Sequence, residues 1–278
     1  MPEHILSLSY GKDSMACFGA CELLGWPIDR VVTAEVWATD TIPADLPPMV
    51  EFKAKADKII KDRWGIEVEH FSAQQAGKRK TYENTFYKRV SNCSMKKRQE
   101  NPNFRRIGVP DLYGFPVAIK GSWCVSEIKI SAIRKLQTKG DIFYLGIAAD
   151  EPNRFHNLTE TKKSPLMEAG WTEADCRRWC EENDLLSPIY TTATRGGCWF
   201  CHNQSVGQLR LLRKNYPELW ALMLKWDKDS PVTFHADGHT VHDFDRRFQM
   251  EDEGLIYPDD RVFRWDMLDS EMLNYRLF

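Results

Sequence analysis

The sequence predicts an α/β fold: a doubly wound, mostly parallel sheet with helices on both faces, and a smaller helical and irregular region towards the C-terminus. The prediction rests on short apolar runs that alternate with longer amphipathic runs between residues 4 and 71. Strands of a parallel sheet are covered on both faces, so they are nearly continuous apolar segments. A chain of 278 residues can form one large domain with an appendage.

Each element carries local signals. Glycines follow the first two expected helices, at Gly25 and Gly65, where helices commonly end. Thr172 and Asp175 have the spacing of a capping box at the start of a later helix. The expected strands cover residues 4–8, 31–36, 66–71 and 141–148, and the expected helices cover 13–24, 49–64, 124–136, 172–182 and 206–226.

The segment Ser9–Ser14 (Ser-Tyr-Gly-Lys-Asp-Ser) joins the first expected strand to the first expected helix. Backbone N–H groups at a helix N-terminus point at anions, Gly11 lets the backbone approach closely, and Lys12 adds a positive charge. The spacing is too short for the common G-x-x-x-x-G-K-[ST] loop. The alternative is an ordinary turn with Asp13 or Ser14 as N-cap. The segment predicts a nucleotide-phosphate site, within a nucleotide-binding domain at 1–165 that precedes a C-terminal region at 166–278.

Composition and charge limit the classes of function. The formal net charge of −2 argues against a generally basic nucleic-acid-coating protein. No stretch approaches about 18 uncharged apolar residues, so no membrane span is expected. The start of the chain lacks the layout of a signal peptide, which predicts a cytoplasmic, reducing location. There the eight cysteines are expected as ligands, nucleophiles or core residues rather than as disulfides.

Residues 74–115 form an irregular and basic excursion from the expected domain. Long loops inside compact domains are usually functional or disordered. The excursion is either a solvated segment or a charged flap that meets a polyanionic substrate. Its basic clusters are Lys78–Lys80, Lys88–Arg89, Lys96–Arg98 and Arg105–Arg106.

Cys198 and Cys201 form a C-x-x-C turn, the strongest metal-ligand signal in the chain. Two thiolates do not complete a tetrahedral site, so further ligands are needed. Cys124 follows a glycine turn and is the best third ligand, and Cys93, inside the basic excursion, is the best fourth. Four cysteines suit zinc or an iron–sulfur cluster, and the spacing does not separate the two.

The remaining cysteines have helical spacing. Cys17 and Cys21, and likewise Cys176 and Cys180, are four residues apart within expected helices, which predicts packed helix faces. The histidines and aspartates of residues 235–245 could bind a divalent metal, but a polar loop is the preferred interpretation.

Four segments together resemble the phosphoadenosine phosphosulfate (PAPS) reductase-like family of the PP-loop superfamily, the ATP-pyrophosphatase or adenine nucleotide alpha-hydrolase-like proteins. The resemblance covers about residues 4–205. The segments are Ser9–Ser14, similar to S-G-G-x-D-S with Tyr10 in place of the first glycine; Gly146–Arg154, similar to G-x-R-x-x-E-S-x-x-R; Pro165–Cys201, similar to the family's Pro-Leu segment that runs into G-C-x-x-C; and Trp123–Lys129, similar to C-C-x-x-x-K with Trp123 in place of one cysteine.

The resemblance implies a Rossmann-like PP-loop fold and a set of site residues. Lys12 and Asp13 are the implied catalytic residues, and Cys124, Cys198 and Cys201 would ligate a 4Fe–4S cluster. Placing Cys93 as fourth ligand is our inference, because the family pattern does not supply it. The implied nucleotide-binding residues are Ser9, Tyr10, Gly11, Lys12, Asp13, Ser14, Gly146, Glu151 and Arg154, the last facing anionic groups.

Two departures from the family pattern bear on the reaction. Sulfonucleotide reductases of this family use a nucleophilic cysteine on a C-terminal tail, and here no cysteine follows Cys201. Ala148 stands where the family's first arginine would bind phosphate or sulfate. Both departures favour a reaction other than PAPS reduction.

The first hypothesis is therefore an enzyme that uses ATP or an adenylyl sulfonucleotide, has an iron–sulfur centre, and acts in sulfur transfer or modification of a larger acceptor. ATP would adenylate an oxygen of the acceptor, pyrophosphate would leave with Mg²⁺ neutralising its charge, and a sulfur nucleophile would displace AMP. The basic excursion would dock a polyanionic acceptor such as tRNA or DNA.

Two alternatives stay open. One is a PAPS-type reductase in which Cys93 or an external thiol is the nucleophile. The other is a non-catalytic, nucleotide-sensing protein with structural zinc. The apolar face of residues 206–226 belongs either to the core, which we prefer, or to a homodimer surface.

Overall fold

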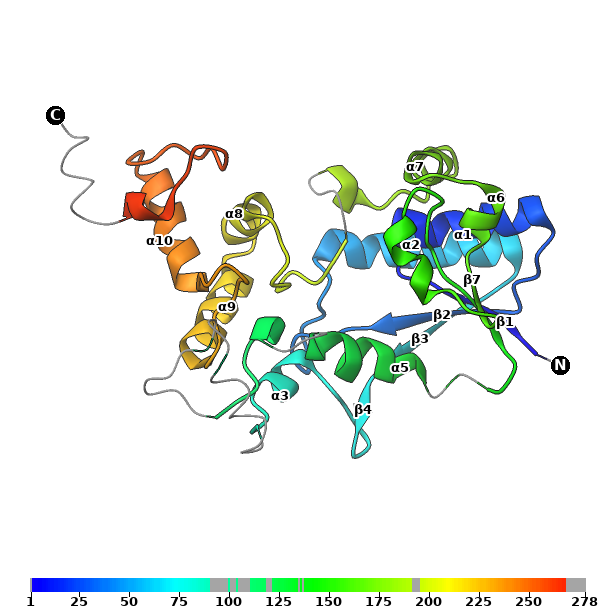
Figure 1. Ribbon diagram of the computed structural model, residues 1–278, viewed down its shortest axis with the longest axis horizontal. Coiled ribbons are helices and arrows are strands. Elements are labelled where there is room, and N and C mark those ends of the chain that lie inside the picture. The colour runs from blue at the N-terminus through cyan, green and yellow to red at the C-terminus, as the bar shows by residue number, and fades with distance from the viewer. Residues whose placement is uncertain are drawn as a thin grey trace. The chain divides into compact units, whose positions relative to one another are not determined.

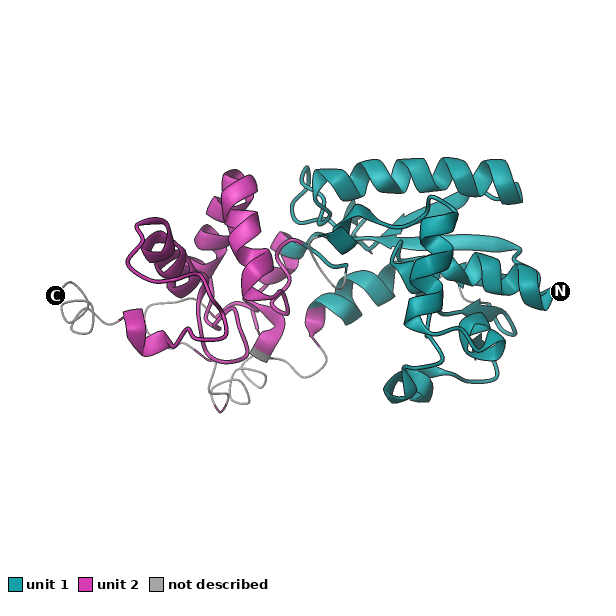
Figure 2. Cartoon of the chain, turned by 90° about the horizontal axis from the view of Figure 1, so that it is seen from above, with its two compact units in different colours: residues 1–82, 124–198 teal, residues 83–123, 199–278 magenta. Residues whose placement is uncertain are grey.

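The computed structural model describes residues 2–90, 100, 104, 111–118, 122–134, 136, 138–191 and 196–268. The chain forms two compact units, shown in Figure 2: Met1–Tyr82 with Cys124–Cys198, and Glu83–Trp123 with Trp199–Phe278. This division differs from the boundary expected at residue 165. The helices at 165–182 pack on the first helix of the sheet unit, so they belong to that unit.

The first unit contains a five-stranded sheet in the order β3-β2-β1-β6-β7, and every pair of neighbours is parallel. The expected α/β class with a mostly parallel sheet is confirmed. The strands are β1 (His4–Ser7), β2 (Arg30–Glu35), β3 (Val68–Ser72), β6 (Ile142–Tyr144) and β7 (Lys162–Lys163).

Alternate residues of the central strands point to the two faces of the sheet, as a pleated strand requires. Leu6 and Val31 belong to the larger core, which includes α1 (Lys12–Leu24) and α2 (Pro47–Trp64). Their neighbours Ile5 and Val32 belong to a smaller core on the opposite face. Figure 1 shows α1 and α2 on one side of the sheet and α5 (Ser131–Arg134) on the other. Helices therefore cover both faces, as expected.

Nine of the thirteen residues of helix α1 are buried, because α6 (Pro165–Ala169) and α7 (Glu173–Glu182) pack against it. A Cβ on Gly19 would lie 2.3 Å from the Trp179 Nε1, so the close packing of α1 on α7 requires glycine there. The expected capping box is present: Thr172 Oγ1 accepts from the Asp175 N–H (3.3 Å), and Asp175 accepts from the Thr172 N–H (3.0 Å).

The expected helix at 124–136 departs from α-helical geometry. Residues Val125–Ile130 form a π-helix that continues into α5, and Ser122 just before it has a φ of 44°. π-Helical turns occur often at functional sites. The smaller elements are β4 (Gln74–Gln75), β5 (Lys78–Arg79) and α3 (Tyr82–Phe86), with 3₁₀ turns at Pro116–Ala118, Pro152–Asn157, Pro188–Thr191 and Trp265–Leu268.

The second unit is helical, with α8 (Val206–Asn215), α9 (Pro217–Asp229) and α10 (Val241–Asp252). The prediction of one helix over 206–226 is wrong, because Pro217 lacks an N–H and disfavours helical geometry in the residue before it. The apolar face is buried within the chain, which confirms the core interpretation for Leu209 and Met223 (both 0% exposed).

Aromatic side chains form much of the core of the second unit. Trp199 and Trp226 are 1% and 0% exposed, and their rings stack with centroids 5.6 Å apart. Phe115 and Phe234 meet edge to face at 5.1 Å. Among the described residues, no helix combines the length and apolar character needed to cross a membrane.

Candidate functional site

The strand order brings two predicted segments together. The chain runs from β1 outward through β2 to β3, and β6 then pairs with the other side of β1. The order therefore reverses between β1 and β6. Open α/β sheets bind ligands at such a reversal, outside the carboxyl ends of the strands. The segments Ser9–Ser14 and Gly146–Arg154 follow these two strands.

The loop Ser9–Ser14 is closed by hydrogen bonds between its own serines. The Oγ of Ser14 accepts from the Ser9 N–H (3.1 Å), lies 2.9 Å from the Ser9 Oγ, and donates to the Gly11 carbonyl (3.0 Å). Both hydroxyls thus shape the loop, while direct binding of phosphate by them stays a prediction.

Gly11 is the N-cap residue of α1, with φ −77° and ψ 156°. Asp13 and Ser14 lie inside the first turn, so the alternative in which one of them caps the helix is wrong. Glycine has no side chain with which to cap the first-turn N–H groups. The Lys12 N–H donates to the Tyr190 hydroxyl at 3.0 Å. The N-terminus of α1 therefore has the backbone character of an anion site, with Tyr190 beside it.

Tyr10 extends from this loop into the core. Its φ is 57°, and its side chain is fully buried. The hydroxyl donates to the Asp57 Oδ1 at 2.6 Å and lies 3.3 Å from the His70 Nε2. Burial and the hydrogen bond to the Asp57 carboxylate raise the pKa of Tyr10. Its side chain is engaged within the protein, so any contribution to nucleotide binding comes from its backbone.

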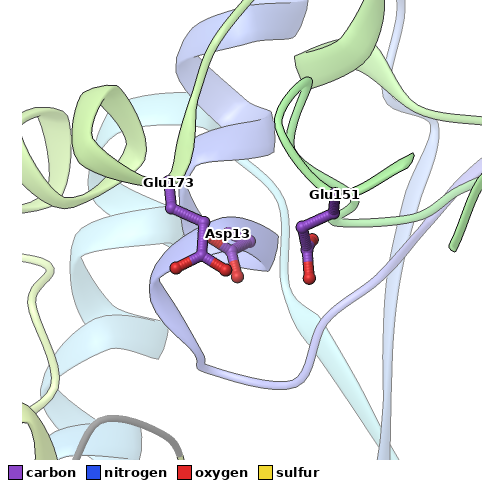
Figure 3. A group of neighbouring side chains, drawn as sticks. All are labelled: Asp13, Glu151 and Glu173. Atoms are coloured by element: carbon purple, nitrogen blue, oxygen red, sulfur yellow. The ribbon is translucent and has the colours of Figure 1, made fainter. Parts of the chain in front are cut away.

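Three carboxylates lie together at the N-terminus of α1, as Figure 3 shows. They belong to Asp13 on α1, Glu151 in the segment after β6, and Glu173 at the first position of α7. One oxygen of each lies within 4.8 Å of the others, and no other group of three or more His, Cys, Asp or Glu among the described residues has this spacing.

Glu173 is absent from the predicted site residues. The only local signal is the Thr172 capping box, which places Glu173 at the start of α7 and so identifies its position but not its neighbours. Tyr190 is likewise absent from that prediction.

The Lys12 ammonium lies among these carboxylates, 2.7 Å from the Asp13 Oδ1 and 3.1 Å from the Glu173 Oε2. Burial acts to lower the pKa of Lys12, but the hydrogen bonds and charges of Asp13 and Glu173 outweigh it, so this pKa is raised. Burial raises the pKa of Asp13, with Glu173 and Glu151 adding to the effect and Lys12 opposing it. The Lys12 ammonium therefore neutralises two of the three acidic groups, Asp13 and Glu173.

Gly146 brings the segment that follows β6 directly against the first turn of α1. A Cβ there would lie 2.5 Å from the Ser14 backbone nitrogen. Further along, the Glu151 Oε2 accepts from the Ala148 N–H at 3.1 Å, and both Glu151 oxygens lie 2.8 Å from the Arg154 Nη1. The guanidinium of Arg154, predicted to face anionic groups, is thus paired with Glu151 in this structure, and its side chain is 48% exposed.

The cysteines divide by burial as their spacing predicts. Cys17, Cys21, Cys176 and Cys180 are at most 2% exposed, which confirms that they are core residues. Burial raises the pKa of their thiols, to about 12 for Cys21 and Cys180. The Cys180 Sγ donates to the Lys12 carbonyl at 3.3 Å, so this packed face supports the first turn of α1.

The predicted metal ligands differ from these core cysteines. Cys124, Cys198 and Cys201 are each partly exposed, and Cys124 immediately precedes the π-helix. Cys93 lies outside the described residues. The four-cysteine metal site stays a prediction.

In the described part of the basic excursion, charged side chains contact other residues of the same chain. Lys80 pairs with Glu127, and the Arg79 guanidinium lies 3.7 Å from the centre of the Trp37 ring. Lys96–Arg98 and Arg105–Arg106 lie outside the described residues. The histidine segment 235–245 is partly helical, and His242 Nδ1 lies 2.5 Å from the Asp227 Oδ2.

Comparison of the chain with protein-family models, with curated proteins and with solved structures finds no match.

Proposed function

We propose that the protein is a PAPS reductase-like PP-loop enzyme that binds ATP or an adenylyl sulfonucleotide, with the phosphates at the N-terminus of α1. The observation that supports this most is one juxtaposition at the sheet reversal. An N-terminus capped by glycine, the Lys12 ammonium and three carboxylates meet there. Such a set provides both the positive charge that phosphates need and the oxygen ligands that a phosphate-bound cation needs.

Lys12 is the residue that responds to the phosphates. In this structure its ammonium lies 2.7 Å from the Asp13 Oδ1 and 3.1 Å from the Glu173 Oε2, and so neutralises both carboxylates. A phosphate at the helix N-terminus offers the ammonium a more highly charged partner, and charge-assisted hydrogen bonds to phosphate are strong. Lys12 therefore turns from the carboxylates to the phosphate when the nucleotide binds, and the N–H groups of α1 contact the same anion.

Asp13, Glu151 and Glu173 would hold Mg²⁺. Their oxygens lie within 4.8 Å of one another, and carboxylate oxygen is the donor that this cation prefers. The ion, when bound, neutralises negative charge on the phosphates. Asp13 requires its ionised form for this role.

The chemistry we propose is activation followed by sulfur transfer. An oxygen of the acceptor attacks the α-phosphorus of ATP, the bond to pyrophosphate breaks, and a sulfur nucleophile then displaces AMP from the activated acceptor. Lys12 stabilises the charge that develops on the phosphates. Cys93, Cys124, Cys198 and Cys201 would hold an iron–sulfur cluster, and thiolates are the ligands such clusters use. The cluster would supply redox or sulfur-carrying chemistry, and zinc is the alternative occupant.

The acceptor we propose is a polyanion such as tRNA or DNA, docked by the basic excursion at residues 74–115. A Lys- and Arg-rich segment binds such partners through their phosphates.

The test is nucleotide binding and pyrophosphate release by anaerobically purified protein. We expect micromolar binding of ATP with Mg²⁺, and release of pyrophosphate. Asp13→Ala should weaken binding at least tenfold and abolish release, while Asp62→Ala, an exposed acid on α2, should match the wild type. Absence of nucleotide binding would overturn the proposal.

The same preparation distinguishes the alternatives. Iron and acid-labile sulfide support the cluster, whereas stoichiometric zinc without pyrophosphate release supports a nucleotide-sensing protein. Release of sulfite from PAPS with a thiol donor supports sulfonucleotide reduction.

A further inference from the structure

A chain of four polar side chains lies behind the loop Ser9–Ser14. The Tyr10 hydroxyl donates to the Asp57 Oδ1 at 2.6 Å, and the Asp57 Oδ2 lies 3.0 Å from the His70 Nε2. On the other side of the ring, the His70 Nδ1 lies 3.0 Å from the Glu35 Oε1. Asp57 is on α2, His70 on β3 and Glu35 at the end of β2, so the chain connects the loop to three separate elements.

The backbone of Tyr10 needs such an anchor. Its φ of 57° lies in the left-handed region, which residues other than glycine adopt at an energetic cost. Non-glycine residues persist there only where surrounding contacts hold them. The Tyr10 ring is 0% exposed, and the Lys53 ammonium lies 5.0 Å from its centre. Removal of the contacts that hold Tyr10 should release the loop to other conformations.

The polar atoms along the chain have defined partners, and the His70 Nε2 lies near both the Asp57 Oδ2 (3.0 Å) and the Tyr10 hydroxyl (3.3 Å). The two oxygens of Asp57 serve different neighbours, Oδ1 the tyrosine hydroxyl and Oδ2 the imidazole. The two nitrogens of His70 likewise face two different carboxylates. An imidazole N–H can donate to a carboxylate oxygen, and hydrogen bonds to charged groups are stronger than neutral ones. His70 therefore fixes the carboxylate that fixes Tyr10.

We propose that Asp57 and His70 are positioning residues for the phosphate loop, acting through the Tyr10 hydroxyl. They hold Tyr10 at its positive φ and so keep the N–H groups that follow it oriented towards a phosphate. The inference rests on the proposed function, because it names what keeps that site in its binding conformation. It also accounts for a tyrosine at the position where a glycine would adopt the same φ without strain.

The test uses the probe ATP with Mg²⁺ and a double-mutant cycle. Tyr10→Phe keeps the buried ring and removes the hydroxyl, and Asp57→Ala removes its partner. Each should weaken ATP binding about tenfold, because the loop is less often in its binding conformation. The double variant should bind no more weakly than the worse single variant, because the two residues act as one unit. Additive losses would overturn the inference.

Tyr144→Phe is the matched control. Tyr144 is also buried in the sheet unit, at 1% exposed, and its hydroxyl lies 2.6 Å from the His4 Nδ1. This control loses a comparable hydrogen bond and should lower the melting temperature without changing ATP affinity. If Tyr10→Phe and Tyr144→Phe bind ATP equally well, the role of Tyr10 is only structural and the inference is wrong.

A second measurement needs no ligand. Hydrogen exchange of the amides at residues 11–14 should be about tenfold faster in Tyr10→Phe and unchanged in Tyr144→Phe, because only the first variant frees the loop. If the wild type binds no ATP, the proposed function fails, and the exchange rates then decide the inference on their own. Equal exchange in the two variants would overturn it.

Discussion

Replacement of Gly146 by alanine tests the approach of the two loops that form the site. A Cβ at this position would lie 2.5 Å from the Ser14 nitrogen, and 2.8 Å from both the Ser14 Cα and the Asp13 carbonyl carbon. These neighbours are backbone atoms at the start of a buried helix, so no side chain can rotate away. Ordinary contact begins near 3.4 Å, so β6 and α1 must separate by about 0.9 Å.

Two effects of different size follow from this separation. Overpacking of this kind destabilises by about 1–3 kcal/mol, which for a protein of this size lowers Tm by roughly 2–5 °C. The same shift moves Asp13 away from Glu151, two residues whose oxygens lie within 4.8 Å of each other. A misplacement of about 1 Å can reduce a rate by about 100-fold. Loss of function should therefore exceed what the loss of stability explains.

The assay is thermal unfolding beside ATP titration and pyrophosphate release, well below Tm. Gly207→Ala is the control, since a Cβ there would meet no atom within 4 Å and alanine is the better helix former. It should leave ATP affinity unchanged and Tm unchanged or slightly higher. A Gly146→Ala variant with wild-type Tm and wild-type ATP affinity would refute the close approach of β6 to α1.

Three further predictions concern single contacts. Cys201→Ala should lose bound metal while Cys180→Ala retains it, as measured by metal analysis, because burial raises the pKa of the Cys180 thiol to about 12 and disfavours the ligating thiolate. Thr172→Ala removes the cap of α7 and should lower the free energy of unfolding in urea by about 1 kcal/mol. Hydrogen bonds from Thr138 and Glu3 lower the pKa of Asp141, so its contribution to stability is present above the ordinary pKa of 3.8 and is lost as pH falls below it. Asp141→Asn should therefore show a smaller loss of Tm between pH 5 and 2 than the wild type. An equal loss in the two proteins would contradict the contribution of ionised Asp141 to stability.

The fold was predictable where local pattern and tertiary structure agree. Strand β1 and helix α1 are visible as an apolar run followed by a helical pattern, and Gly25 ends α1 with a φ of 66°. The cysteine pairs at helical spacing were predictable for the same reason, because a helix face that packs repeats every three or four residues. The division of residues 206–229 into two helices was not predicted, although Pro217 is the residue that breaks the helical pattern.

The candidate site was predictable only in part. The sequence alone determined that a glycine turn with Lys12 and Asp13 follows a buried strand, which is a local property of adjacent residues. Only the tertiary structure decided that Glu173, from a helix 160 positions further along, completes the acidic group at Asp13. It also decided that the Tyr10 side chain turns into the core towards Asp57. The reason is physical: a carboxylate or hydroxyl acquires its partner from the packing of separate elements on the sheet, and no local pattern records which elements meet.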